Sequence, residues 1–194
     1  QKMLSIRPTP VKSRPSFTLL PEHPPELTQI VPLATIAADH VEALLDAAFG
    51  PDRFGRTAYK LRSGTKALPD LSFAALDDDG NLIGTLQSWP VRLNRPDGGY
   101  DPLTLVGPVA VVPNLQRGGM GKAMMLALLA AADAGATDAM VMIGDPEYYE
   151  RFFGFSADAT GGWDLPGPFE KHRLLARIRR PGGVGRDGMI GPDV

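Results

Sequence analysis

A cluster of glycines between an apolar run and an alanine-rich segment constrains this chain most strongly. Residues 103–112 are largely apolar and end before Pro113, and Gly118, Gly119 and Gly121 follow shortly after. A segment rich in Ala, Leu and Met then runs to residue 134. This order predicts a buried strand, a glycine loop and a helix. Because a helix N-terminus presents free N–H groups and a favourable dipole, the loop is a candidate phosphate site.

Composition limits the classes of protein to which the chain can belong. Its 194 residues are 43% hydrophobic and 22% charged, which suits one domain with a buried core. The net charge of −2 gives no reason to expect nucleic acid or an anionic membrane as a partner. The absence of cysteine excludes disulfides, thiolate catalysis and cysteine metal sites, and it fits a cytoplasmic protein. No apolar run approaches the ~20 residues of a membrane span.

The chain divides into three parts. Residues 1–26 contain six prolines, which oppose helix and central strand, so this part is predicted to be an extended arm. Residues 27–180 carry the periodic apolar segments and are predicted to form a single domain. Residues 181–194 are rich in Gly and Pro and are expected to be a loose C-terminal tail.

Within the domain, apolar periodicity and turn residues predict a mixed sheet of the α/β (α+β) class. The early strands are joined by hairpins, whereas strand–helix–strand order in the second half implies a parallel pair with a right-handed crossover. The acidic run 77–79 before Gly80 is interpreted as a hairpin turn, because a calcium loop would need further oxygen ligands that this segment lacks. Strands are expected at 27–33, 71–76, 82–91, 103–112, 139–143 and 173–179, helices at 35–49, 52–62, 120–134 and 147–152, and a rigid loop at 163–168.

Two nucleotide-binding motifs fail at the glycine loop. A P-loop requires a first glycine where Gln116 stands and a magnesium-binding hydroxyl where Ala123 stands. A dinucleotide fingerprint requires a third glycine where Met124 stands, and it normally opens a doubly wound sheet. The loop instead matches the pattern Q-x-x-G-x-G at Gln116, Gly119 and Gly121, behind the apolar strand and before an alanine-rich helix.

That pattern resembles the acetyl-coenzyme A signature of the GNAT superfamily of N-acetyltransferases. Residues 29–49 are similar to its first strand and helix, and DPEYYERFFGF at 145–155 is similar to its fourth helix. Within the superfamily, the chain is most like the bacterial YhbS-type predicted acetyltransferases. The resemblance implies a GNAT-like fold in which the strand before the loop splays from the next strand to form a cofactor cleft. It also implies acetyl-CoA as cosubstrate, held by the strand edge and loop residues Val109, Ala110, Val111, Gln116, Arg117, Gly118, Gly119, Met120, Gly121 and Lys122.

The resemblance also points to a tyrosine acid in the fourth helix. Tyr149 is preferred over Tyr148, although four residues rather than the usual three separate Tyr149 from Gly154. Backbone N–H groups of Val111 or Ala110 are the candidates for stabilising a developing oxyanion. Three side chains stay open as the general base, although each also has an ordinary structural explanation: Glu150, Asp145, which can cap the helix, and His40. His23 and His172 have no partners in sequence, so no metal site is expected.

The expected function is acetyl transfer to a primary amine of a small molecule or a protein. Transfer of a longer acyl group is one alternative, and a non-catalytic acyl-CoA-binding module is another, favoured by the displaced tyrosine. The acceptor is not indicated by any charge cluster. The basic residues of 52–62 are interpreted as a solvated helix face, with contact to an anionic substrate or to the CoA phosphate as the alternative. An edge strand near the C-terminus is a place for a homodimer contact. These basic residues are Arg53, Arg56, Lys60 and Arg62.

Overall fold

The structure, a computed structural model, describes residues 29–115 and 119–194. The proline-rich arm and the predicted cofactor-loop residues Gln116, Arg117 and Gly118 lie outside the described residues. The described strands form one mixed sheet in the order β1-β2-β3-β4-β5-β7, with β8 paired to β3 and β6 paired to β8. This architecture confirms the predicted fold class.

Most predicted elements are present with shifted ends. The strands are β1 Gln29–Pro32, β2 Phe73–Leu76, β3 Leu82–Asn94, β4 Tyr100–Val111, β5 Ala139–Ile143, β6 Gly162–Asp164, β7 Leu174–Ile178 and β8 Asp187–Pro192. The helices are α1 Ala38–Phe49, α2 Thr57–Leu61, α3 Met120–Ala134 and α4 Pro146–Phe153, and a 3₁₀ turn at Pro51–Gly55 precedes α2. The acidic hairpin turn is confirmed, since the Asp77 carboxylate accepts the N–H groups of Asn81 and Asp79.

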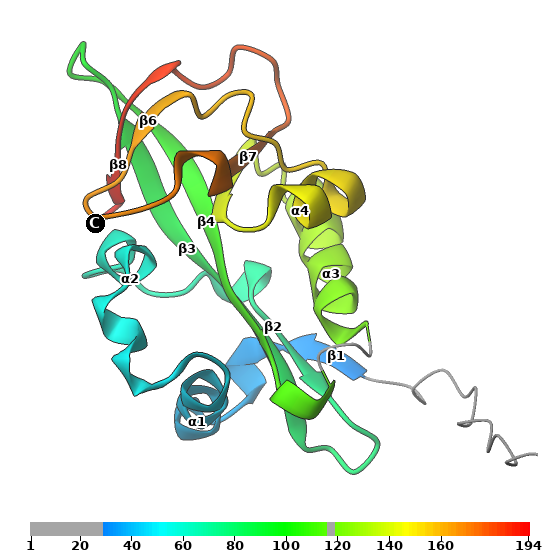
Figure 1. Cartoon of the computed structure of the whole chain (residues 1–194). Coiled ribbons are helices and arrows are strands. Elements are labelled where there is room, and N and C mark those ends of the chain that lie inside the picture. The colour runs from blue at the N-terminus through cyan, green and yellow to red at the C-terminus, as the bar shows by residue number, and fades with distance from the viewer. Residues whose placement is uncertain (1–28, 116–118) are drawn as a thin grey trace, which may run out of the picture.

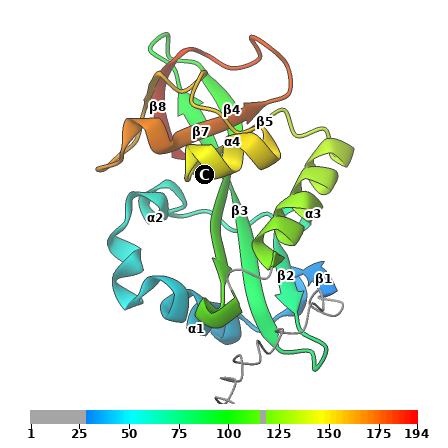
Figure 2. The same ribbon diagram turned by 45° about the vertical axis from the view of Figure 1, so that its right-hand side comes forward.

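Two helices cover opposite faces of the long β3–β4 pair (Figures 1 and 2). Helix α1 buries Val41, Leu44 and Leu45, whose spacing places them on one helical face, against Ala110 of β4. Helix α3 packs on the other face, where Met124 and its neighbours share a core with Val111. Because successive strand residues point to opposite faces, Ala110 serves one core and Val111 the other.

Strand β4 keeps β3 as a partner for much longer than it keeps β5. Its parallel pairing with β5 is limited to Thr104↔Met140 and Leu105↔Val141, whereas its pairing with β3 continues to Val111↔Gly84. Between these points β4 has a bulge, because three steps along β4 from Val106 to Val109 match two steps along β3. The two parallel strands therefore diverge after Leu105, which confirms the predicted splay.

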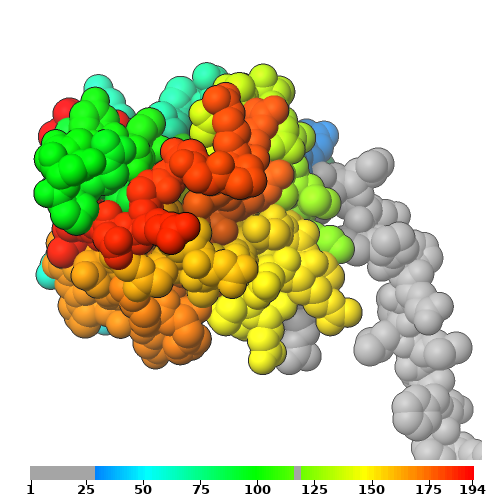
Figure 3. All heavy atoms as spheres, turned by 90° about the horizontal axis from the view of Figure 1, so that it is seen from above, coloured from blue at the N-terminus to red at the C-terminus, as the bar shows by residue number. Residues whose placement is uncertain are grey.

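The expectation of a loose tail from residue 181 is wrong for β8. This strand pairs antiparallel with β3 from Val91↔Pro192 to Asn94↔Met189, and Ile190 is fully buried. The predicted rigid loop at 163–168 also begins as strand β6, where Trp163 is buried and donates through Nε1 to the Gly185 carbonyl at 2.9 Å. Figure 3 shows this orange and red C-terminal segment lying along the surface of the domain. The glycine and proline content of this segment predicts a loose tail, but pairing with β3 and β6 stabilises β8 as a strand.

Two absences concern the described residues only. In ranges 29–115 and 119–194, no helix combines the length and apolar character that crossing a membrane requires. The same ranges contain no group of three His, Cys, Asp or Glu side chains arranged to hold a metal ion.

The position of β8 predicts a stability effect. We expect Ile190→Ala to lower the free energy of unfolding by about 2–5 kcal/mol, because it leaves a cavity beside Leu93 and Trp163. Met189→Ala is the control, since this neighbouring side chain is 45% exposed, and it should change the same quantity by less than about 0.5 kcal/mol. Denaturant unfolding followed by circular dichroism measures both. Equal, small effects would contradict the packed position of β8.

Candidate active site

Two adjoining cavities open where β4 and β5 diverge. The smaller, which we call the loop-side cavity, has a volume of about 250 Å³ and lies between the end of β4, α3 and α4. The larger, which we call the arginine-lined cavity, has a volume of about 520 Å³ and lies between α2, the β4 bulge and the start of α4. Three residues line both cavities and mark their junction: Phe49, Val109 and Tyr149.

The free edge of β4 faces the loop-side cavity. The Val112 N–H donates to the Ile83 carbonyl at 2.9 Å, so the main chain of Val112 points toward β3. Main-chain groups alternate along an antiparallel strand, so those of Ala110 also point toward β3 and those of Val109 and Val111 point away. Ala110 therefore lines the cavity, but its main-chain N–H and C=O groups are used in pairing with β3. Val109 and Val111 are the residues that offer N–H and C=O groups to a ligand.

The start of α3 closes the loop-side cavity from the other side. Gly119 has φ +81°, a conformation that favours glycine, and the Ala123 N–H donates to its carbonyl at 3.0 Å. The N–H groups of the first turn, Met120 to Lys122, have no acceptor within an α-helix. A Cβ at Gly121 would lie 4.0 Å from the Val111 Cγ2, so this turn packs on the Val111 side chain, and Gly121 lines the same cavity as Val109 and Val111. The exposed Lys122 ammonium lies 5.0 Å from the centre of the Phe152 ring.

Tyr149 is the tyrosine at the junction. Burial, with smaller effects of Tyr148 and Asp145, raises the pKa of its hydroxyl to about 12. A Cβ at Gly144 would lie 2.6 Å from its ring, so the absence of a side chain there lets the ring pack closely. Tyr148 lines only the loop-side cavity, is 36% exposed and contacts Tyr149 edge-on at 5.0 Å between ring centres. Tyr149 thus lines both cavities and Tyr148 only one, and the choice of Tyr149 as the acid stays a prediction.

The candidate bases are not gathered at this junction. Glu150 is exposed on α4 and lines neither cavity, so the structure does not bring this predicted catalytic residue to the site. Asp145 lines the larger cavity, but its carboxylate accepts the Glu147 N–H at 3.1 Å and caps α4. His40 and His172 are exposed and line neither cavity, and His23 lies outside the described residues.

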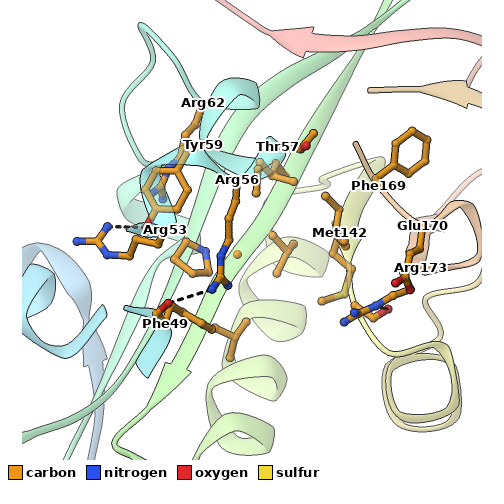
Figure 4. A pocket seen from close by; sticks show the side chains of 18 of the residues that line it. Phe49, Arg53, Arg56, Thr57, Tyr59, Arg62, Met142, Phe169, Glu170 and Arg173 are labelled. Carbon is orange, nitrogen blue, oxygen red and sulfur yellow. Dashed lines mark hydrogen bonds between the residues drawn. The ribbon is translucent and has the colours of Figure 1, made fainter. Parts of the chain in front are cut away.

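The interpretation of the basic residues as a solvated face is wrong for Arg53, which is buried, and for Arg62, which is half-buried. Arg53 is 1% exposed and donates to Glu42 at 2.5 Å, to Asp46 at 2.9 Å and to the Tyr59 hydroxyl at 2.5 Å. Burial opposes its charge, but these hydrogen bonds outweigh that effect and raise its pKa. Arg56 and Lys60 are exposed, as predicted. Arg56 and Arg62 nevertheless line the same cavity as Arg53, as Figure 4 shows.

Sequence reasoning missed the far wall of this cavity. Phe169, Glu170 and Arg173 lie there, on the segment between β6 and β7 (Figure 4). The segment is fixed to the α2 wall by the Thr57 hydroxyl, which donates to the Pro168 carbonyl at 2.7 Å. No local pattern signals this contact, because its partners are far apart in the chain.

Comparisons with known proteins agree with this architecture. The family model described as Acetyltransferase (GNAT) family matches residues 38–155. The structure is similar to the GNAT family N-acetyltransferase YhbS of Escherichia coli, solved with CoA, at 23% identity and a TM-score of 0.66 over 86% of this chain and 89% of that one. It is also similar to a GNAT family acetyltransferase of Brucella melitensis, solved with acetyl-CoA, at 24% identity and a TM-score of 0.61 over 87% and 97%. No curated protein sequence matches the chain.

The buried environment of Tyr149 predicts that its hydroxyl ionises only at a pH well above that of an exposed tyrosine. In a protein with ¹³C-labelled tyrosine Cζ atoms, the resonance that Tyr149→Phe removes should show no ionisation up to pH 10.5. The reason is that burial raises the pKa of this phenol to about 12, above the ordinary value of about 10. A midpoint at or below pH 10 for that resonance would contradict the buried position of the hydroxyl.

Proposed function

This chain belongs to the acetyltransferase (GNAT) family, and on that premise we propose that it transfers an acetyl group from acetyl-CoA to a primary amine. One observation carries the proposal: the free edge of β4 lies beside the first turn of α3 and leads into a second cavity at Tyr149. Such a path suits an extended donor that enters at the helix and ends at the junction with an acceptor pocket.

The donor has three kinds of group, and the cleft has a partner for each. Its pantetheine arm carries amides. These can form hydrogen bonds with the outward main-chain groups of Val109 and Val111, as an added strand does at the edge of a sheet. Its pyrophosphate suits the N–H groups of Met120, Gly121 and Lys122 and the helix dipole. Gln116, Arg117 and Gly118, which complete the loop, remain proposed contributors on the motif alone.

The thioester supplies the acyl carbon, and the protein positions and polarises it. The neutral amine forms a bond to that carbon and the carbon–sulfur bond breaks. The nitrogen loses one proton to solvent and the departing sulfur takes up one, so a neutral amine yields the amide and the free thiol with no net release of protons. The outward N–H of Val111 or Val109 can stabilise the negative charge on the acyl oxygen. Ala110 is not proposed for this role, because its N–H belongs to the β3 pairing.

The pKa of Tyr149 decides how this residue acts. A phenol with a pKa of about 12 is a weaker acid than an ordinary thiol, whose pKa is about 8.5. Complete proton transfer to the departing sulfur would therefore cost about 5 kcal/mol. We infer that the Tyr149 hydroxyl donates a hydrogen bond to the sulfur as it leaves, and that solvent completes the protonation.

The position of Tyr149 also bears on the non-catalytic alternative. That alternative rested on four residues, rather than three, between Tyr149 and Gly154. Helix α4 ends with Gly154 at φ +71°, and Tyr149 still lines both cavities despite the extra residue. The geometry therefore favours a catalytic protein over a binding module.

A matched pair of substitutions tests the donor site. Gly121→Glu should weaken acetyl-CoA binding at least about 100-fold, because a carboxylate at the first turn of α3 repels the pyrophosphate. The fold should remain intact, since Gly121 is helical and a Cβ there meets nothing closer than 4.0 Å. Gly121→Ala is the control and should bind within about threefold of wild type. Isothermal titration calorimetry measures all three proteins. Undiminished affinity of Gly121→Glu would contradict the site.

The tyrosines provide a second matched pair. Tyr149→Phe should lower kcat by about 10²-fold or more with little change in the KM for acetyl-CoA, because only the hydrogen bond to the leaving sulfur is lost. Tyr148→Phe should lower kcat by less than about fivefold, since Tyr148 lines only the loop-side cavity. Thiol release over a panel of amines measures both. Equal effects of the two variants would refute the assignment to Tyr149.

A further inference from the structure

Arg62 is a half-buried guanidinium of the arginine-lined cavity that has no carboxylate partner among the described residues, as is also true of the exposed Arg56 and of Arg173 on the opposite wall. Arg62 lies over the Tyr59 ring at 3.6 Å and the Trp89 ring at 4.6 Å, and its Nη1 donates to the Gln87 Oε1 at 3.0 Å. Among the described residues, no carboxylate lies within 4.0 Å of it. Arg53, by contrast, has its charge offset by Glu42 and Asp46.

The surroundings of Arg62 make an unpaired charge costly. Burial lowers the pKa of its guanidinium, although Tyr59 and the more distant Glu42 favour the charged form. The two aromatic rings hold the planar group in place, and its Nη1 donates to Gln87, which leaves a guanidinium with further N–H donors for a ligand. A fixed guanidinium of this kind matches the paired oxygens of a carboxylate or a phosphate.

Arg56 adds a second charge to the same wall. Its Nη2 donates to the Phe49 carbonyl at 2.9 Å, and it has no ion pair among the described residues. The opposite wall carries carboxylates of Asp145 and Glu170, together with Arg173, close to the Tyr149 end. The α2 wall therefore carries two positive charges without a carboxylate partner among the described residues, whereas the opposite wall carries two carboxylates and one guanidinium. Figure 4 shows Arg56 and Arg62 on one side of the cavity and Glu170 and Arg173 on the other.

This positive wall is not needed for the phosphates of the donor. The proposed pyrophosphate site is at Gly121, in the loop-side cavity, and neither Arg56 nor Arg62 lines that cavity. Tyr149 lies at the junction, so an anion beside Arg62 would belong to the other substrate. The volume of about 520 Å³ suits a small molecule.

We propose that the acceptor is a small primary amine that also carries a carboxylate or phosphate group, which Arg62 binds while the amine points toward Tyr149. Arg56 strengthens the positive wall, and the carboxylates of the opposite wall favour the amine end. This assignment of the substrate class rests on the proposed acetyl transfer. Arg62 is then the residue that determines specificity for the anionic group.

The test compares matched acceptors. The panel consists of ω-amino carboxylic acids of two to six carbons, their primary amides and aminoalkyl phosphates of similar length, and thiol release gives kcat/KM for each. With wild type, kcat/KM for the best anionic member should exceed that of its amide at least about tenfold, as expected for a charge-assisted bidentate contact. The acid and phosphate arms show which oxyanion the cavity prefers.

Variants assign the preference to Arg62. Arg62→Gln should lower kcat/KM at least about tenfold for the anionic members and leave the amides within about twofold, and Arg62→Lys should restore part of the loss. Arg180→Gln is the control, because Arg180 is an exposed surface residue that pairs with Asp138 and lines neither cavity. Thermal unfolding confirms that each variant is folded.

A binding measurement separates this inference from the proposed function. Calorimetric titration of the same acids and phosphates into the protein without donor should show binding that Arg62→Gln weakens at least about tenfold. Binding of this kind without turnover of any amine would support the anion site and refute acetyl transfer to amines of this panel. Turnover with equal kcat/KM for acids and amides, insensitive to Arg62→Gln, would overturn the anion site and leave acetyl transfer standing. If no anionic probe binds or reacts, the anion site is also overturned.

Discussion

The divergence of two parallel strands is the constraint on which this structure depends. Strand β4 pairs with β5 only through Thr104 and Leu105, but its bulge and its continued pairing with β3 carry it on to Val111. A sheet that splays here has to leave main-chain groups of β4 without a strand partner. Helices α1 and α3 bury the two faces of the same strand, so the edge is the one side of β4 left for a ligand.

A buried arginine shapes the other half of the site. Arg53 joins α1, through Glu42 and Asp46, to Tyr59 of α2, and thereby fixes the wall on which Arg62 is stacked. The guanidinium of Arg53 has two carboxylate partners, whereas that of Arg62 has none among the described residues. The same type of side chain therefore has two different roles in one cavity. Arg53 holds the wall, and Arg62 supplies the charge that we assign to acceptor recognition.

The sequence predicted those features that depend on local pattern. Strand β4, helix α3 and the splay implied by the family resemblance all follow from the 109–155 region, and the role of Tyr149 stays a prediction from the same region. Strand β8 was missed because Gly188, Gly191 and Pro192 indicate a loose segment, whereas its pairing is determined by β3, which is distant in the chain. The buried state of Arg53 was missed because its carboxylate partners meet it only after α1 and the following turn fold together.

The most direct test of the account is amide hydrogen exchange at single-residue resolution, measured by NMR with and without acetyl-CoA. The account predicts that the N–H groups of Val109 and Val111 exchange rapidly in the free protein and become protected on binding. The N–H of Ala110 should be protected in both states, because it belongs to the β3 pairing. Unchanged exchange at Val109 and Val111 in protein saturated with acetyl-CoA would contradict the claim that the free edge of β4 holds the donor.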